Sequence, residues 1–322
     1  MKHSIEKPKV FFGADVASRH IDIACHGSQQ VRRIANDAEP LAAWLKTLPE
    51  GAVLAMEATG RYHLGLARLA HERGLRVYVL NPRDVKHYAR GVGQRGKTDR
   101  LDARLLARYV EREHAELHAW QPPSAPAQRL GELLHRRAAL VRHRTALRQS
   151  FAEDASLAEL LGQMLAPLQQ VLKALEAQIA RAAAELPDGA AALERITSVP
   201  GLGLLSAAAL LKLFQRLGGA GADAAVAFTG LDPRPMDSGD KHGVRRLSKR
   251  GDPELRRLLF NAAMAASRTA AWRAEYERHR AKGLARTAAL VALARKLVRV
   301  AFTLFKTQTL FDPRRQQQAL AA

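Results

Sequence analysis

The sequence predicts an α/β domain at the amino terminus, followed by a chain that is almost entirely α-helical. Three observations predict this division. Apolar segments with strand character alternate with helical segments over residues 9–109. A proline-rich segment, QPPSAP at residues 121–126, cannot remain helical. Beyond it, residues 128–186 are mostly good helix formers.

Composition points to a folded protein that binds a polyanion. The 322 residues include 51 Lys and Arg against 31 Asp and Glu, which gives a formal charge of +20. Nucleic acid is therefore the leading partner. No apolar run is long enough to span a membrane, and the polar first ten residues do not resemble a secretion signal, so we expect a cytoplasmic protein with no membrane partner. The single cysteine and the scattered histidines predict no zinc site.

The amino-terminal elements can be placed in order. Residues 9–14, 20–25 and 30–34 have strand patterns, and a helical spacing of apolar residues follows at 40–48. A strand at 52–56, a helix at 62–73 and a strand at 76–80 come next. Three antiparallel strands followed by strands that alternate with helices predict a ribonuclease H-like sheet.

Four carboxylates occupy positions where this fold would bring them together. Asp15 and Glu57 end the first and fourth strands, and the ends of parallel neighbours meet at one edge of a sheet. Asp99 and Asp102 open a helix at a spacing that points both the same way. Such a pair also complements a helix dipole, but four converging carboxylates favour Mg²⁺, with Mn²⁺ as a possible substitute. Asp22 in the second strand is expected to face solvent.

The segment at residues 81–97, between the last strand and the acidic helix, is basic and punctuated by glycine. We interpret it as a mobile loop that contacts nucleic acid. An ordinary solvated loop is the alternative.

The middle region, residues 128–186, predicts two long helices broken around Pro167. Leu133, Leu140 and Leu147 recur every seven residues, which is typical of a coiled-coil hairpin. Such a hairpin serves either dimerisation or the spacing of two domains, and the pattern does not decide between them.

The carboxy-terminal region carries a helix-hairpin-helix-like turn, SVPGLG at residues 198–203. The turn amides at Gly201 and Gly203 are suited to a phosphate of a nucleic-acid backbone, with simple helix packing as the alternative. The rest of the region, through residue 305, is helical and basic.

The long irregular segment at residues 228–251 is expected to be functional because of its length. Ser238 is followed by Gly239 and by a run of Lys and Arg residues that could neutralise a phosphate attacked by the hydroxyl. Ser248 is the competing nucleophile, although its position before a helix better suits a phosphate contact. Asp252 is predicted to cap that helix.

Taken together, these motifs resemble one known family. GADVAS around Asp15, MEATG around Glu57, KTDRLDA at Asp99 and Asp102, SVPGLG, FTGLDP and the stretch SG…RLSKRGDPELRR from Ser238 resemble the DEDD insertion-sequence transposases. These are bridge-RNA-guided recombinases with a RuvC-like domain, a coiled coil and a carboxy-terminal transposase domain.

The resemblance implies both an organisation and a mechanism. The domains would be a RuvC-like domain at 1–122, a helical coiled-coil linker at 123–190 and a transposase domain at 191–322. Asp15, Glu57, Asp99 and Asp102 would be catalytic and hold Mg²⁺, and Ser238 would form a covalent phosphoserine link to DNA. The partners would be target and donor DNA, a structured guide RNA and further copies of the chain, as a dimer or tetramer.

The residues expected to contact nucleic acid are basic side chains and glycines of the segments described above: Lys97, Arg100, Gly201, Gly203, Gly239, Lys241, Arg245, Arg246, Lys249, Arg250, Arg256 and Arg257. A metal-dependent junction endonuclease that uses the carboxylates alone is the alternative to a recombinase. A non-catalytic nucleic-acid-binding protein is a further alternative.

Overall fold

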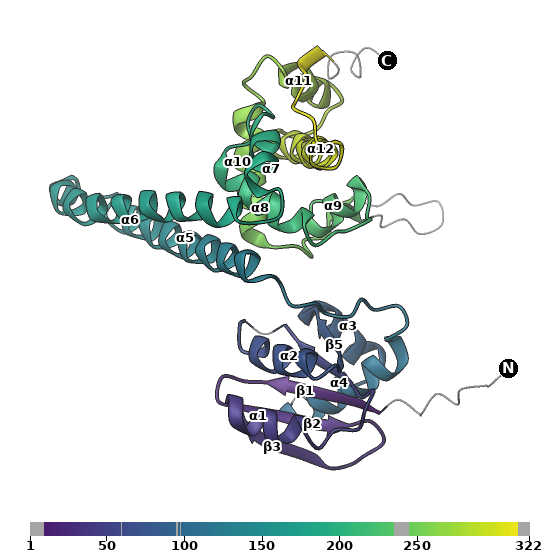
Figure 1. The fold of residues 1–322 in the computed structure, drawn as a ribbon. Helices are drawn as coiled ribbons and strands as arrows, with labels where there is room; N and C mark the ends of the chain where they lie inside the picture. Colours follow the sequence, from purple (N-terminus) through teal and green to yellow (C-terminus); the bar gives the residue numbers. More distant parts are fainter. Residues whose placement is uncertain (1–9, 59, 95, 97, 235–244, 315–322) are drawn as a thin grey trace. The chain divides into compact units, whose positions relative to one another are not determined.

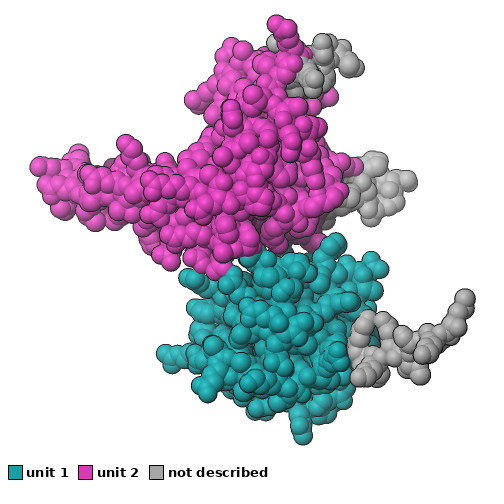
Figure 2. All heavy atoms as spheres, viewed as in Figure 1, with its two compact units in different colours: residues 1–123 teal, residues 124–322 magenta. Residues whose placement is uncertain are grey.

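A computed structural model describes residues 10–58, 60–94, 96, 98–234 and 245–314 of the chain. The chain forms two compact units, residues 1–123 and residues 124–322, which Figure 2 shows in different colours. The boundary follows Pro122 and Pro123, in the proline-rich segment. The first unit contains a sheet and the second is mostly helical, as the sequence predicts.

The first unit is built on a five-stranded sheet in the order β3-β2-β1-β4-β5. Its first three strands pair antiparallel, whereas β1, β4 and β5 run parallel. This topology is compatible with a ribonuclease H-like domain. The strands are β1 (Phe11–Val16), β2 (His20–Cys25), β3 (Val31–Ala35), β4 (Val53–Glu57) and β5 (Arg76–Leu80).

Helices cover both faces of the sheet (Figure 1). Helices α1 (Ala38–Leu45) and α2 (His63–Glu72) bury one apolar cluster against one face. Helices α3 (Pro82–Gly91) and α4 (Asp99–Glu113) bury another against the opposite face. The two clusters fix which strand residues point toward α4.

Helix α3 corrects the prediction that residues 81–97 form a loop. The side chain of Asn81 accepts a hydrogen bond of 2.9 Å from the backbone N–H of Arg83, and Pro82 occupies the first helical position. This pair of residues is a helix start signal. Val85 of this helix is buried in the apolar cluster on this face of the sheet. Arg83, Lys86 and Arg90 of the segment therefore lie on a helix over residues 82–91.

The second unit is a helical cluster from which a long hairpin projects (Figure 1). Its short strands β6 (Pro233–Arg234) and β7 (Arg246–Leu247) pair antiparallel. Its helices are α5 (Ala125–Ser150), η1 (Ala155–Leu157), α6 (Ala158–Ala184), α7 (Gly189–Thr197), α8 (Leu204–Phe214), α9 (Ala222–Thr229), α10 (Pro253–Ala266), α11 (Arg273–Ala281) and α12 (Arg286–Thr307).

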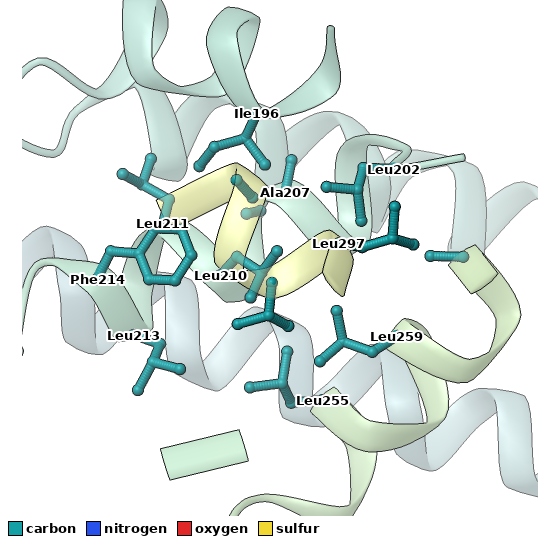
Figure 3. Close-up of a cluster of buried hydrophobic side chains, with 14 of the residues drawn as sticks. Ile196, Leu202, Ala207, Leu210, Leu211, Leu213, Phe214, Leu255, Leu259 and Leu297 are labelled. Atoms are coloured by element: carbon teal, nitrogen blue, oxygen red, sulfur yellow. The ribbon is translucent and has the colours of Figure 1, made fainter. Parts of the chain in front are cut away.

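One apolar core holds this unit together. Leu210, Leu211 and Phe214 of α8 lie at its centre, against Leu259 of α10 and Leu297 of α12 (Figure 3). Each of these side chains is almost fully buried. The base of the hairpin joins the same core through buried residues of α5 and α6. Helix α8 is therefore the element around which this unit packs.

The break in the hairpin lies at residues 151–157 and not at Pro167. Asp154 accepts a hydrogen bond of 2.9 Å from the backbone N–H of Ser156, which starts a new helical turn there. Pro167 lies inside α6 on its exposed side. A proline removes one backbone hydrogen bond, but the 27-residue helix continues through it.

No helix in the described part of the chain is both long and apolar enough to cross a membrane.

Candidate functional site

Helix α4 lies directly on strand β1 because of a glycine. A Cβ atom added to Gly13 would lie 2.2 Å from the carbonyl oxygen of Ala103 and 2.3 Å from the backbone nitrogen of Ala107. Only glycine allows the two backbones to approach this closely. Asp15 lies two residues beyond Gly13 and therefore points to the same face of the sheet. The contact places the first turn of α4 over the end of β1 that carries Asp15.

The first turn of α4 brings two more carboxylates. Thr98 caps the helix, and its side chain accepts a hydrogen bond from the backbone N–H of Leu101 at 3.3 Å. Asp99 and Asp102 follow within the first turn. Gln94 Nε2 donates to Asp102 Oδ1 at 3.2 Å. The cap fixes the helix start, and the spacing of three directs both acids to one side.

Glu57 completes the predicted set from the neighbouring strand. Strand β4 runs parallel to β1, with Met56 paired to Ala14, so that Glu57 follows beside Asp15. Ala55, two residues earlier, lies in the apolar cluster beneath α4. Glu57 therefore belongs to the face that α4 covers. The sequence prediction that these strand ends meet is borne out by the register.

The pKa of Asp15 reflects the acids that surround it. Burial, followed by the negative charges of Asp102, Asp99, Glu57 and Asp22, raises the pKa of Asp15 to about 6. Like charges and desolvation both disfavour the ionised carboxylate. The structure thus brings together all four carboxylates that the sequence predicted, and it adds a fifth.

That fifth carboxylate, Asp22, corrects a prediction. Its side chain does not face solvent: the residue is 1% exposed. Asp22 pairs directly with Asp15 across the antiparallel strands β1 and β2, so both point to the face that α4 covers. The polar alternation in β2 suggested a solvated face, but α4 covers it. The hairpin register contained the missed signal, because Asp15 and Asp22 are equally distant from its turn.

Arg33 of strand β3 joins this cluster. Its Nε donates to Asp22 Oδ1 at 3.0 Å, and its Nη2 donates to Asp22 Oδ2 at 2.6 Å. The same Nη2 donates to Asp99 Oδ2 at 3.0 Å. His20 Nε2 lies 3.7 Å from that oxygen. Neither Arg33 nor His20 was singled out from the sequence.

The chemistry of these donors fits a divalent cation. The five carboxylates offer hard oxygen ligands, which Mg²⁺ and Mn²⁺ prefer. Their charge outweighs that of Arg33, and the raised pKa of Asp15 reports the resulting repulsion. Within this cluster His20, Asp22 and Asp99 each offer a ligand atom, and these atoms lie within 4.8 Å of one another. A cation among the carboxylates would relieve the repulsion.

The predicted nucleophile and its neighbours lie outside the described residues. Ser238, Gly239 and Lys241 belong to the undescribed segment at 235–244, and Lys97 is a single undescribed position. The structure describes the two ends of the segment, which pair as β6 and β7. Arg245 and Arg246 lie at this pairing and are exposed.

Ser248 is buried, which overturns its interpretation as a nucleophile or phosphate contact. The residue is 3% exposed, and its hydroxyl donates to Asp232 Oδ1. Its backbone N–H donates to the carbonyl of Asp232 at 2.9 Å. Ser248 therefore ties the strand after the undescribed segment to the strand before it.

The remaining predicted contacts lie in the second unit, apart from Arg100, which is exposed on α4. Asp252 caps α10 as predicted, accepting from the N–H of Glu254 at 2.8 Å. Arg256 donates to the carbonyls of Gly251 and Thr229, which anchors the chain before α10. Lys249 and Arg250 are exposed beside this anchor.

The turn between α7 and α8 adjoins a cavity with charged side chains in its lining. Gly201 packs against α10, where a Cβ atom would lie 2.5 Å from that of Ala266, whereas nothing lies within 4 Å of one at Gly203. A cavity of about 480 Å³ adjoins both glycines. Its charged lining comes from three helices: Arg137 and Arg144 of α5, Glu176 of α6 and Arg257 of α10. Arg137 is paired with Glu176 at 2.6 Å. Arg257 is also paired with Glu254, with contacts of 2.8 and 2.6 Å.

Two family models match the chain, and they match separate parts of it. Residues 12–154 match the DEDD transposase model of IS110, and residues 193–278 match a model described as "Transposase IS116/IS110/IS902 family". The first match contains Asp15, Glu57, Asp99 and Asp102. The fold, the carboxylate cluster and these matches define an enzyme of the transposase class. More particularly, the chain carries the two transposase domains of the IS110/IS116/IS902 family.

Curated relatives agree along almost the whole chain. The "Pilin gene-inverting protein" of Moraxella lacunata is 28% identical over 328 residues, which cover 95% of this chain and 98% of that protein. The "Probable family 20 transposase" of Pseudomonas aeruginosa is 28% identical over 347 residues, with 96% and 98% covered. The "Transposase for insertion sequence element IS1328" of Yersinia enterocolitica is 27% identical over 340 residues, with 93% and 98% covered.

Proposed function

We propose that this transposase excises and inserts an insertion sequence by cutting and rejoining DNA strands. The observation that carries the proposal is the convergence of acids on Asp15, whose pKa rises to about 6. A half-buried carboxylate surrounded by others is costly in its ionised form unless a cation neutralises it. The relatives named for transposition and for the inversion of a pilin gene support a reaction on DNA.

In this proposal Asp15, Glu57, Asp99 and Asp102 hold divalent metal, with Mg²⁺ preferred and Mn²⁺ as a substitute. A bound cation would neutralise phosphate oxygens and the charge that develops as the phosphodiester reacts. The chain's own residues set where this occurs: Thr98 fixes the start of α4, and Gly13 lets that helix lie on β1. The site is therefore preorganised by packing rather than by the ion.

Ser238 is the proposed nucleophile. Its hydroxyl oxygen would attack a DNA phosphorus atom, form a phosphoserine link and expel one sugar oxygen of the strand. Attack by a strand end would reverse these steps and restore the phosphodiester. Arg245, Arg246 and Arg250, which follow the segment of Ser238, would neutralise the reacting phosphate.

The remaining parts follow the family resemblance. The predicted division is a RuvC-like domain, a coiled-coil linker formed by the α5–α6 hairpin, and a transposase domain with a helix-hairpin-helix-like turn at α7–α8. A structured guide RNA that pairs with target and donor DNA would select the sites. A dimer or tetramer would bring the carboxylates of one protomer to the serine of another.

The test is trapping of a covalent protein–DNA adduct in the presence of Mg²⁺. Wild-type protein should form an adduct that maps to Ser238 by mass spectrometry, and Ser238→Ala should form none. Ser156→Ala, at an exposed position of η1, is the matched control and should keep the adduct. If Ser238→Ala cleaves DNA normally while Asp102→Asn does not, the chain is a metal-dependent nuclease instead. Adducts that persist in Ser238→Ala would refute the proposed nucleophile.

A further inference from the structure

Arg33 bridges a buried carboxylate and a carboxylate of the proposed metal site. Its guanidinium contacts both oxygens of Asp22, and one nitrogen, Nη2, also contacts Asp99 at 3.0 Å. The Asp22 side chain is 2% exposed, whereas that of Asp99 is 55% exposed. The guanidinium is thus anchored firmly on its inner side and reaches Asp99 on its outer side.

The two contacts of Arg33 differ in what breaking them would cost. Removing the cationic partner of a buried carboxylate is strongly destabilising, so Arg33 and Asp22 stay together. The contact with Asp99 lies at an exposed side chain, where water and salt weaken an ion pair. Asp99 can therefore exchange partners while Arg33 remains in place.

We propose that Arg33, anchored on Asp22, is a built-in counter-cation that holds Asp99 in the metal-free protein and releases it to the divalent cation. This inference rests on the proposed metal site. Arg33 is a positioning residue: it acts through Asp99 and supplies no ligand itself, and Asp22 is its anchor. The arrangement keeps the acidic cluster partly neutralised before metal binds, and it makes metal compete with a guanidinium for one carboxylate oxygen.

The sequence offers a matched control. Arg32 precedes Arg33 on β3 and is also exposed, but it pairs in register with Ile23, whereas Arg33 pairs with Asp22. Successive residues of a strand point to opposite faces, so Arg32 points away from the carboxylates. Arg32→Gln removes the same formal charge as Arg33→Gln without touching Asp99.

The experiment measures binding of Mn²⁺ alone to full-length protein, by electron paramagnetic resonance of the free ion, with no nucleic acid present. Arg33→Gln should bind Mn²⁺ at least about threefold more tightly than wild type, and Arg32→Gln should bind nearly as wild type does. Asp22→Asn should bind at least about threefold more weakly, because Arg33 then rests on Asp99 alone.

The double variant Asp22→Asn/Arg33→Gln tests competition between Arg33 and the metal for Asp99 even if Arg33→Gln fails to fold. It keeps the net charge of the wild type and leaves no buried charge unpaired, so tighter Mn²⁺ binding must come from the loss of competition at Asp99. We expect the double variant to bind at least about threefold more tightly than wild type.

The outcomes separate the two proposals. Lower melting temperatures with unchanged Mn²⁺ affinity in the variants would show that the pair is merely structural and would overturn the inference while leaving the metal site intact. Wild-type protein that binds no Mn²⁺ would overturn the proposed metal site and this inference together.

Discussion

At the scale of single residues, the feature that marks the site is the raised pKa of one carboxyl group, that of Asp15. Asp15 is half-buried and lies near four other carboxylates, and together these raise its pKa to about 6 from an ordinary value of 3.8. The folded protein therefore binds this proton more tightly than the unfolded chain does. The stabilisation from that proton is complete below pH 3.8 and is lost as the pH rises through 6.

Asp15→Asn should remove the repulsion between the ionised Asp15 side chain and the neighbouring carboxylates. Asparagine resembles the protonated carboxyl, so without metal the variant should melt at a higher temperature than wild type at pH 8. The difference should shrink as the pH falls toward 4, because Asp15 itself becomes protonated. Thermal unfolding in the presence of EDTA measures the melting temperatures of the variant and the wild type at each pH. A difference of the same size at pH 8 and pH 4 would argue against a raised pKa.

Residue patterns predicted four of the five carboxylates in the cluster, but not Asp22 and not Arg33, which binds it. Asp15 and Glu57 could be placed because polar residues at the ends of apolar strands are conspicuous. Asp22 was misjudged because alternation in a strand identifies two faces without saying which face a later helix covers. Arg33 could not be found at all, since an arginine in an edge strand is ordinary unless its partner across the sheet is known to be buried.

At the scale of elements, one contact aligns the carboxylates: helix α4 on strand β1. Gly13 permits this contact, and the helix start at Thr98 determines where Asp99 and Asp102 fall. The sequence predicted both elements. Their contact could not be predicted, because the need for a glycine at position 13 arises only when the helix lies on it.

Gly13→Ala should disturb the site without altering any of its side chains. The added methyl group would overlap the backbone of α4, which must shift or strain at a cost of about 1–3 kcal/mol. We expect lower thermal stability and weaker Mn²⁺ binding. Gly65→Ala, within α2 and with nothing near its Cβ, is the control and should be neutral or stabilising. Equal behaviour of the two variants would contradict the role of Gly13.

Element boundaries were predicted where the start signals were strong. Asp252 and Pro253 marked the start of α10 correctly. Asn81 and Pro82 form the same kind of signal, yet the glycines after them suggested a loop, and α3 was missed. The helix break predicted at Pro167 lies instead at the turn capped by Asp154. Capping residues were thus better guides than a lone proline or glycine.

At the scale of the whole molecule, the two units carry different parts of the proposed reaction. The carboxylates lie in residues 1–123, and the α7–α8 turn, the cavity and the segment of Ser238 lie in residues 124–322. The net charge of +20 extends over the chain. The positive charge predicts that the chain binds the phosphates of a nucleic acid. The order of the motifs predicts which unit carries which part of the proposed reaction.

Binding should therefore depend strongly on salt. Each phosphate contact releases condensed counterions, so the logarithm of the binding constant should fall linearly with the logarithm of salt concentration. Arg257→Gln, at the cavity beside Gly201, should reduce the slope by about one unit. Fluorescence anisotropy with labelled duplex DNA measures the slope. Arg136→Gln, on an exposed part of α5 outside the cavity lining, is the comparison, and an equal reduction there would show that the cavity has no special role.

If the carboxylates and the serine serve one reaction, recombination must depend on both. Recombination between two DNA sites should be measured for Asp102→Asn and for Ser238→Ala, with Glu113→Gln at the far end of α4 as the control. Each of the first two variants should lose activity about a thousandfold or more, and the control should keep it. Recombination retained by either Asp102→Asn or Ser238→Ala would contradict the claim.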